Sequence, residues 1–428
     1  MWHHLELHLC VGQCVGAGFF ICELGTINMT SDGGVKLRRA IEKQKIVHIE
    51  KLIVAVSASG PFLQKITNFV DTVIYNNYRD ATFFVPNDNT ISEIDIISAR
   101  TTRTFIAGSN VNLESFSIEQ CLIDRLPPTL SKMTRLKSFS IRRCMLTVLR
   151  LDMFVENQNL NYLDLSYNQI RQLIPITGRP ARMLSIAKLY LAGNVLERLD
   201  MAVFVAMPLL SELYITDNRI VTLDVSAPIA LPNLSDLYLG YNKLVSLDLR
   251  NLTLPKVETF SFGPNALTQM PILPRLMPKF NYISLFANNL TQLDMTYFRP
   301  YPNLQKIYIT SNQITTVRAS SPVRLPLVHL VLTDNKITTF NITGWHMPNI
   351  TLLNLDGNRL TLVPPVFDRY PKVVLVMDRN PLPCNALSPF KDRLNNDQLQ
   401  KEQRPLLMAC TTTSSFAIDE TLKACCDK

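Results

Sequence analysis

Apolar residues recur along most of this chain in one fixed pattern. In an eleven-residue block, the first, fourth, sixth and eleventh positions are apolar and the ninth is Asn or Cys, as in LNYLDLSYNQI from Leu160 and LSDLYLGYNKL from Leu234. The block recurs at spacings of 22 to 26 residues, and all 44 apolar positions of the eleven copies from Cys121 to Asn358 hold apolar residues. At 47% apolar composition, the chance of this in one fixed frame is on the order of 10⁻¹⁴.

This block is typical of leucine-rich repeats, and each copy predicts one short strand. The apolar fourth and sixth positions alternate with outward residues, which is the period of a strand. A single repeat cannot bury its apolar face, so neighbouring repeats stack and their strands form one parallel sheet. The segments between strands are too short for long helices, so we expect irregular coil and single turns, with Phe154, Phe204 and Phe298 pointing inward. The predicted fold class is α/β, a curved leucine-rich repeat solenoid with a parallel β-sheet on its concave face and an irregular, short-turn convex face.

The ninth position of the block predicts a ladder of buried amides. Each Asn lies where a strand ends, and its amide can bond backbone groups of the adjacent loop that would otherwise be buried unpaired. The predicted ladder residues are Asn168, Asn194, Asn218, Asn242, Asn265, Asn288, Asn312, Asn335, Asn358 and Asn380. Cys121 and Cys144 hold the same position in the two preceding copies, where Cys is an accepted alternative. We expect two buried thiols there, because stacked side chains run parallel.

Four cysteines in the last 45 residues predict a disulfide-stabilised C-terminal cap. Consecutive Cα atoms are about 3.8 Å apart, which is shorter than the ~4.4–6.8 Å of a disulfide. Cys425 and Cys426 are therefore expected to reach back, one to Cys384 and one to Cys410, and both connectivities stay open. A zinc site is disfavoured because adjacent cysteines do not fit the usual Cys-x-x-Cys spacing. A short helix from Ser388 is expected to close the last turn.

The chain is expected to have four parts. Residues 1–60 are a leader or possible signal region, 61–112 an N-terminal cap with a degenerate repeat, 113–383 the leucine-rich repeats, and 384–428 the cysteine-containing cap.

Two segments of the first part are candidates for targeting. Residues 9–22 are apolar enough for a signal core, and residues 51–60 have basic flanking residues and small residues suited to cleavage near Ala58. In the second part, Ile91, Ile94 and Ile96 mimic a repeat strand that ends at Ala99. Residues 61–90 are expected to form further edge strands of the cap.

The C-terminal pattern resembles a known family. PCNALSPF, then a lone Cys, then a terminal Cys-Cys pair, is similar to the leucine-rich immune proteins of mosquitoes, and the run LPPTLSKMTRLKSFSIRRC resembles their early repeats. The resemblance implies a secreted haemolymph factor of innate immunity, and some members of the family act with complement-like thioester-containing proteins. The chain has no heptad region after Cys426, so it resembles the coil-less branch and we expect no coiled-coil dimerisation segment. It also lacks the cysteines that many such proteins carry in their N-terminal cap.

Composition and motifs argue against catalysis. The net charge of +8 is not concentrated in any run of Lys or Arg, so no nucleic-acid partner is expected. No Ser/His/Asp or Cys/His set can be placed, and no glycine-rich phosphate loop occurs. We predict a non-enzyme without catalytic residues, cofactor, metal or small-molecule substrate. The acids beside the ladder are expected to be solvated; they are Asp217, Asp334, Asp356 and Asp378.

Outward strand positions are where a solenoid of this kind binds partners. A partial column of tyrosines is predicted to share the concave face, formed by Tyr162, Tyr190, Tyr214, Tyr238, Tyr282 and Tyr308. Tyrosine is enriched at interfaces because it offers a large contact area with a polar tip. The alternative is structural, since Tyr also favours strands.

Several asparagines begin N-x-S/T glycosylation sequons. Asn28 is one, and the predicted glycosylation sites are Asn233, Asn251, Asn289, Asn341 and Asn349. Asn289 follows a ladder residue and is expected to point to solvent. Chance alone would produce several sequons in a chain so rich in Asn, so they support secretion only weakly.

The resulting hypothesis is a secreted recognition protein of insect innate immunity. It is expected to bind a protein ligand through its concave face: a complement-like thioester-containing protein, another leucine-rich immune protein or a pathogen surface. The alternatives are an intracellular leucine-rich repeat scaffold and a membrane-associated receptor or adhesion ectodomain.

Overall fold

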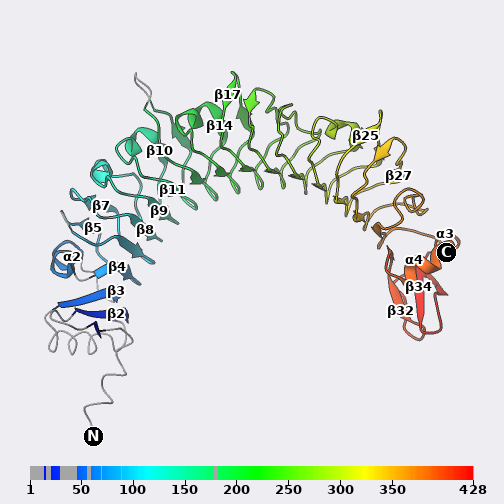
Figure 1. The fold of residues 1–428 in the computed structure, drawn as a ribbon, viewed down its shortest axis with the longest axis horizontal. Helices are drawn as coiled ribbons and strands as arrows, with labels where there is room; N and C mark the ends of the chain where they lie inside the picture. Colours follow the sequence, from blue (N-terminus) through cyan, green and yellow to red (C-terminus); the bar gives the residue numbers. More distant parts are fainter. Residues whose placement is uncertain are drawn as a thin grey trace, which may run out of the picture. The chain divides into compact units, whose positions relative to one another are not determined.

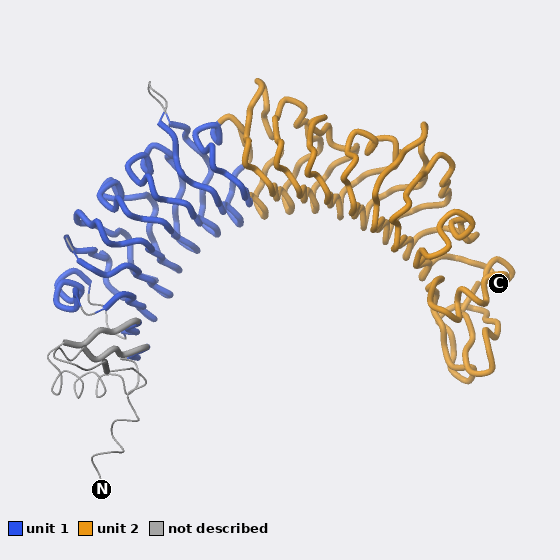
Figure 2. Tube along the Cα trace, in the orientation of Figure 1, with its two compact units in different colours: residues 1–196, 203–214 blue, residues 197–202, 215–428 orange. Residues whose placement is uncertain are grey.

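The computed structural model describes residues 14–15, 21–28, 46–54, 59–68, 70–87, 89–176 and 182–427. Most of the targeting candidate at residues 9–22, and the cleavage position at Ala58, lie outside them. The chain divides into two compact units, residues 1–196 with 203–214 (unit 1) and residues 197–202 with 215–428 (unit 2) (Figure 2). None of the helices in the described residues is both long and apolar enough to cross a bilayer.

Unit 1 is built on a parallel sheet with one strand for each repeat. Its strands in spatial order are β2 (Ile21–Asn28), β3 (Ile46–Val54), β4 (Val70–Tyr75), β6 (Glu93–Ile96), β8 (Ser115–Glu119), β9 (Ser138–Arg142), β11 (Tyr162–Asp164), β13 (Lys188–Tyr190) and β15 (Glu212–Tyr214). β1 (Cys14–Val15) adds one antiparallel strand beside β2.

Unit 2 repeats the same arrangement. Its parallel strands in spatial order are β18 (Asp236–Tyr238), β20 (Thr259–Ser261), β21 (Tyr282–Ser284), β23 (Lys306–Tyr308), β26 (His329–Val331), β29 (Leu352–Asn354), β30 (Val374–Val376) and β31 (Leu399–Gln400). In each unit these strands line the inner side of the stack and the connecting segments lie outside it (Figure 1). The predicted fold class is thereby confirmed.

The outer side carries short strands and single helical turns. In unit 1 these are β5 (Thr82–Val85), β7 (Thr104–Ala107), β10 (Val148–Arg150), β12 (Gln172–Ile174), α2 (Gly60–Ile66), η1 (Pro128–Lys132) and η2 (Leu151–Phe154), and η3 (Met201–Ala206) follows. In unit 2 they are β14 (Arg198–Asp200), β16 (Thr222–Asp224), β17 (Ile229–Ala230), β19 (Leu252–Thr253), β22 (Gln292–Asp294), η4 (Met295–Phe298), β24 (Thr316–Arg318), β25 (Val323–Arg324), β27 (Thr339–Phe340) and β28 (Trp345–His346). The sequence predicts only irregular coil and single turns on the outer side, so the outer strand pairs were not predicted.

The core lies between the inner strands and the outer segments. Phe154, Phe204 and Phe298 are at most 1% exposed and fill it from the outer side, as their spacing predicts. The strand residues that face it stack in register, so that Leu163 pairs with Leu189 and Leu189 with Leu213, all at 0% exposure. Stacking in register buries a continuous apolar core that no single repeat could form.

The ladder asparagines bridge successive repeats within each unit. In unit 1, Asn194 Oδ1 accepts the backbone N–H of Ile170 at 3.0 Å. In unit 2, Asn312 Oδ1 accepts the N–H of Leu290 at 3.0 Å, and its Nδ2 donates to the carbonyl of Leu285 at 2.9 Å. Eight of the ten predicted ladder residues are buried, and Asn242 and Asn265 are half-buried. Each amide therefore pairs groups that are cut off from water.

The N-terminal repeats differ from the predicted cap. β4 pairs with β3 on one side and β6 on the other, so it is an inner strand and not an edge. β3 contains residues 51–54 of the second targeting candidate, so the sheet extends into the range expected to be a leader. Ile91, Ile94, Ile96 and Ala99 are at 0% exposure, as in a regular repeat.

The C-terminal cap is a small helical segment followed by an antiparallel sheet. The segment consists of α3 (Cys384–Leu387), η5 (Ser388–Phe390) and α4 (Lys391–Asn395), and it begins four residues before the helix start predicted at Ser388. The sheet has the order β32 (Gln403–Pro405), β34 (Leu422–Cys426) and β33 (Ser414–Ala417).

Candidate functional site

The parallel strands of unit 1 present two rows of side chains on the concave face. The register pairs Asp164 with Tyr190, then Tyr190 with Tyr214, and in the second row Lys188 with Glu212. Residues at equivalent positions of neighbouring repeats are separated by roughly 4.8 Å, the distance between hydrogen-bonded strands. Side chains that are about 24 positions apart in the sequence therefore contact each other directly.

Three of the predicted tyrosines gather in this part of unit 1. The ring centroids of Tyr162 and Tyr190 are 5.2 Å apart, and those of Tyr190 and Tyr214 are 4.6 Å apart with an angle of 10° between the ring planes. All three side chains are half-buried. We call these residues the tyrosine cluster. It offers a broad aromatic surface whose rings are already held against each other, so little side-chain entropy is lost when a partner contacts it.

Two groups of ion pairs border the tyrosine cluster. Arg142 lies between two acids, with Nη2 3.0 Å from Glu119 Oε2 and Nη1 3.8 Å from Asp164 Oδ2. Lys188 Nζ lies 2.7 Å from Glu212 Oε1. The surface therefore combines aromatic faces with oriented charges, a composition common at the centre of protein interfaces.

Tyr190 connects the aromatic and charged groups. Its hydroxyl donates to Glu212 Oε2 at 2.8 Å. Burial and then this hydrogen bond raise the pKa of Tyr190. Burial opposes ionisation of Glu212, but the hydrogen bonds from Lys188 and Tyr190 prevail and lower its pKa. At neutral pH the phenol is thus a neutral donor and the carboxylate an ionised acceptor, so the pair holds one geometry.

The remaining predicted tyrosines lie in unit 2. Tyr282 and Tyr308 form a pair with ring centroids 5.5 Å apart, and the Tyr308 hydroxyl lies 3.2 Å from His329 Nδ1. Tyr238 stands in register with Ser261, so β20 separates it from that pair. The expected column is therefore interrupted in this unit.

Beyond Tyr308 the outward strand positions of unit 2 are mostly apolar, and His329, Asn354 and Gln400 are the polar residues among them. Val331, Leu352, Val374 and Val376 occupy outward positions of β26, β29 and β30. Val331 is 8% exposed and the other three are half-buried. This surface contrasts with the polar and aromatic surface of unit 1.

Three of the acids beside the ladder of unit 2, which the sequence predicts to be solvated, form ion pairs or border a polar hollow. Arg379 Nη1 lies 2.8 Å from Asp334 Oδ1, and its Nε donates to Asp356 Oδ1 at 3.0 Å. Asp378 borders a polar hollow of about 550 Å³ with buried Lys401, and burial raises the pKa of Asp378. Asp217 and Asp334 are exposed, as the sequence predicts, whereas Asp356 and Asp378 are half-buried.

The two mid-chain cysteines form a disulfide, which corrects the prediction of buried thiols. Cys121 and Cys144 are 4% and 3% exposed, and their sulfur atoms are bonded, with the Cα atoms 4.5 Å apart. Equivalent positions of adjacent repeats are separated by one strand spacing, which falls within the range that a disulfide spans. Parallel stacking therefore brings the two sulfur atoms within bonding distance.

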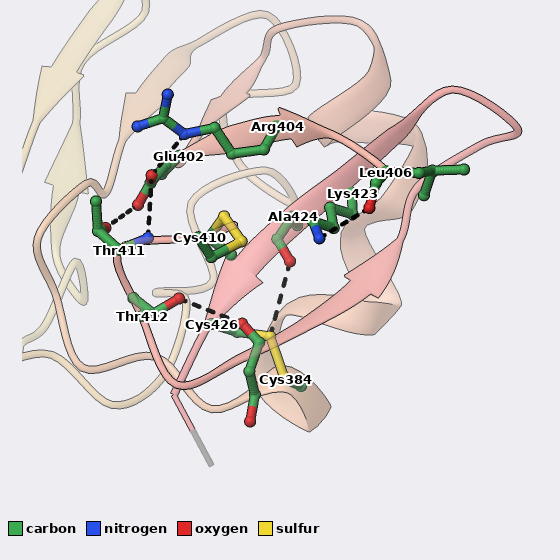
Figure 3. The surroundings of a disulfide bond; sticks show 12 residues. Cys384, Glu402, Arg404, Leu406, Cys410, Thr411, Thr412, Lys423, Ala424 and Cys426 are labelled. Atoms are coloured by element: carbon green, nitrogen blue, oxygen red, sulfur yellow. Dashed lines mark hydrogen bonds and ion pairs between the residues drawn. A yellow bond between two sulfur atoms is a disulfide. The ribbon is translucent and has the colours of Figure 1, made fainter. Parts of the chain in front are cut away.

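The cap contains two disulfides, Cys384–Cys426 and Cys410–Cys425 (Figure 3). This is one of the two connectivities that the sequence leaves open, and the adjacent cysteines do not bond each other. Beside the Cys410 bond, Glu402 accepts from Arg404 Nε at 2.8 Å. The disulfides attach the helical segment and the loop before β33 to the same strand, β34.

Several residues at the site carry no signal in the repeat pattern. Glu119, Arg142, Lys188 and Glu212 occupy outward positions whose residue type varies from repeat to repeat, so no motif marks them. Aligning the repeats by their Asn positions would have placed them beside the tyrosines. The repeat pattern also misses Asn110, which is 0% exposed and whose Oδ1 accepts the backbone N–H groups of Asn112 and Leu113.

Comparison with known proteins supports the fold. The family model described as leucine rich repeat matches residues 208–254 and 302–360, and a second with the same description matches residues 159–178. The comparison with curated proteins found no match.

Solved structures give similar backbones at low identity. The leucine-rich repeat domain of APL1B is 18% identical with a TM-score of 0.57, covering 72% of this chain and 91% of that one. The LRIM1/APL1C complex is 16% identical with a TM-score of 0.57, covering 97% and 71%. TLR13, solved with the RNA ssRNA13, is 18% identical with a TM-score of 0.62, covering 89% and 56%.

At these identities the likeness concerns the fold. The repeat pattern, the parallel sheets, the asparagine ladder and the matching family models agree on it. The fold of this chain is the leucine-rich repeat solenoid.

Proposed function

We propose that this chain is a secreted recognition protein of innate immunity that binds another protein through the concave face of its parallel strands. The observation that carries the proposal is the tyrosine cluster of unit 1 with its bordering ion pairs. Partly buried aromatic residues beside oriented charges are typical of the residues that contribute most to protein binding.

Protein partners are favoured over nucleic acid by charge. The outward positions of β6 to β15 hold five acids (Glu93, Asp95, Glu119, Asp164 and Glu212) and two bases (Arg142 and Lys188). A nucleic-acid surface needs an excess of Lys and Arg to neutralise phosphates. The similar structures include two protein complexes, LRIM1 with APL1C and mouse RP105 with MD-1, and one RNA complex, TLR13 with ssRNA13, so the choice rests on charge.

Secretion is supported by the three disulfides. Disulfides persist in oxidising compartments and are rare in the cytosol. Non-reducing peptide mapping of the protein from its native source tests this: free thiols at Cys384 and Cys410 would contradict secretion and favour an intracellular scaffold. Partition of the expressed protein with membranes would instead favour a receptor or adhesion ectodomain.

The binding face is tested with a purified thioester-containing complement-like protein as the probe, in a surface plasmon resonance assay on the immobilised chain. Tyr190→Ala removes the central ring of the tyrosine cluster, and affinity is expected to fall by at least about tenfold. Tyr167→Ala is the matched control, because Tyr167 is 50% exposed in the same unit but lies outside the strand rows. Equal affinities of the two variants would remove the concave face of unit 1 from the proposal.

A further inference from the structure

The sequons of unit 2 occupy particular positions in its repeats. The residue two after each ladder Asn is a core position, such as Ile220, Leu290 and Ile337, so a ladder Asn does not begin an N-x-S/T sequon. The sequons therefore fall on asparagines outside the ladder. The four that begin at exposed asparagines are Asn251, Asn289, Asn341 and Asn349.

These four asparagines lie outside the concave strand rows. Asn289 directly follows the ladder residue Asn288 at the exit of the strand, and its backbone N–H donates to Leu267 at 2.9 Å. Asn251 and Asn341 belong to the connecting segments, and Asn349 precedes β29. The outward strand positions from β18 to β30 hold no sequon asparagine.

The local hydrogen bonds of two of these side chains are compatible with a glycan on Nδ2. Asn341 uses its Oδ1, which accepts the N–H of Thr343 at 2.8 Å. Asn251 Nδ2 donates to the carbonyl of Val225 at 3.1 Å, and a glycosylated amide keeps one N–H for such a bond. Asn233 differs, because it is half-buried and its Oδ1 accepts from Lys256 Nζ at 2.7 Å. We leave Asn233 out for this reason.

Unit 1 contrasts with unit 2. The sequence has no N-x-S/T sequon that begins between residues 31 and 232. Asn28, at the end of β2, is therefore the one sequon asparagine in the sequence of unit 1, and the repeats from β3 to β15, which carry the tyrosine cluster, contain none.

We propose that Asn251, Asn289, Asn341 and Asn349 carry N-linked glycans, which cover the connecting segments and strand flanks of unit 2. Glycans are bulky and hydrated, so they keep a protein partner away from the surface they cover. Protein contact is thereby restricted to the concave strand rows and to unit 1. This inference rests on the secretion proposed above, because glycosylation of this kind requires passage through the secretory route.

Site occupancy is the first test. The full chain is expressed in insect cells, the medium and the cells are collected separately, and peptides are mapped before and after treatment with a peptide N-glycosidase, which converts each glycosylated Asn to Asp. We expect the chain in the medium, with the four asparagines converted, and one glycan fewer after each Asn→Gln substitution. A chain kept in the cells without glycans would contradict the proposed function. A chain in the medium with these four asparagines unmodified would overturn this inference alone.

The second test moves a glycan onto the concave face. Tyr214→Asn in unit 1 and Tyr308→Asn in unit 2 each create a sequon with the Thr two positions later, Thr216 and Thr310. The matched controls Tyr214→Gln and Tyr308→Gln introduce an amide without an acceptor site. The probe is the same thioester-containing complement-like protein, and mapping verifies occupancy of each new site.

We expect the added glycan at position 214 to weaken binding at least about tenfold beyond Tyr214→Gln. Removal of the natural glycan by Asn289→Gln is expected to leave binding within twofold. A loss of binding with Asn289→Gln that is as large as with Tyr214→Asn would overturn the inference, because the natural glycan would then belong to the interface. Weaker binding with Tyr308→Asn but unchanged binding with Tyr214→Asn would place the protein contact on the concave face of unit 2. That result would contradict binding at the tyrosine cluster and would still support binding through the concave face.

Discussion

Replacement of a ladder asparagine by alanine is expected to destabilise the repeats well beyond the loss of an ordinary hydrogen bond. Asn312 is 3% exposed, accepts the N–H of Leu290 at 3.0 Å and donates to the carbonyl of Leu285 at 2.9 Å. Asn312→Ala leaves the Leu290 N–H buried without a partner, whereas the Leu285 carbonyl keeps the bond from Asn288 Nδ2 at 3.1 Å. An unsatisfied buried group costs about 1–3 kcal/mol, so the free energy of unfolding should fall by roughly that amount.

The measurement combines urea unfolding, followed by far-UV circular dichroism, with amide hydrogen exchange. Repeat proteins can unfold in stages, so exchange at Leu290 gives the local effect that a single midpoint can hide. The matched control is Asn303→Ala in the same repeat, because Asn303 is exposed and its Nδ2 donates to the carbonyl of Pro278 at the surface. The control is expected to change stability by less than about 0.5 kcal/mol. Equal destabilisation by the two variants, or unchanged protection at Leu290, would refute the ladder as a source of stability.

Three further predictions concern stability. Replacing both Cys121 and Cys144 by Ala removes a crosslink over 23 residues and is expected to lower the free energy of unfolding by about 2–4 kcal/mol. An unchanged urea midpoint, or the absence of a linked peptide in non-reducing mapping of the unaltered chain, would contradict the disulfide. Burial opposes ionisation of Asp294, but backbone N–H and hydroxyl donors prevail and lower its pKa from 3.8 to about 2. Because the folded pKa is below the unfolded value, the stabilisation by Asp294 is complete above about pH 4 and is lost as the pH falls towards 2. Asp294→Asn should therefore make the free energy of unfolding less dependent on pH in that window. An unchanged pH dependence would disprove the lowered pKa of Asp294. A Cβ on Gly263 would clash with the carbonyl oxygen of Phe286. Gly263→Ala should therefore lower the thermal midpoint, because overpacking costs about 1–3 kcal/mol of stability, and an unchanged midpoint would contradict this close approach.

The candidate site could be predicted only in part. The outward direction of Tyr190 and Tyr214 follows from the alternation of strand residues, and their spacing of 24 residues implies contact between stacked repeats. The ion pairs of Arg142 and Lys188 could not be predicted in this way. Their partners depend on which polar residues happen to stand in register, and the repeat pattern does not constrain those positions.

The sequence by itself determined the repeat, the direction of the strands, the buried ladder and the cysteine-containing cap. These features are properties of each repeat and its nearest neighbour, so a period of about 24 residues fixes them together. Only the tertiary structure decided that Cys121 bonds Cys144, that Cys384 bonds Cys426, and that β4 is an inner strand. Those outcomes depend on distances between segments that the chain brings together when it folds, and a linear pattern contains no such distances.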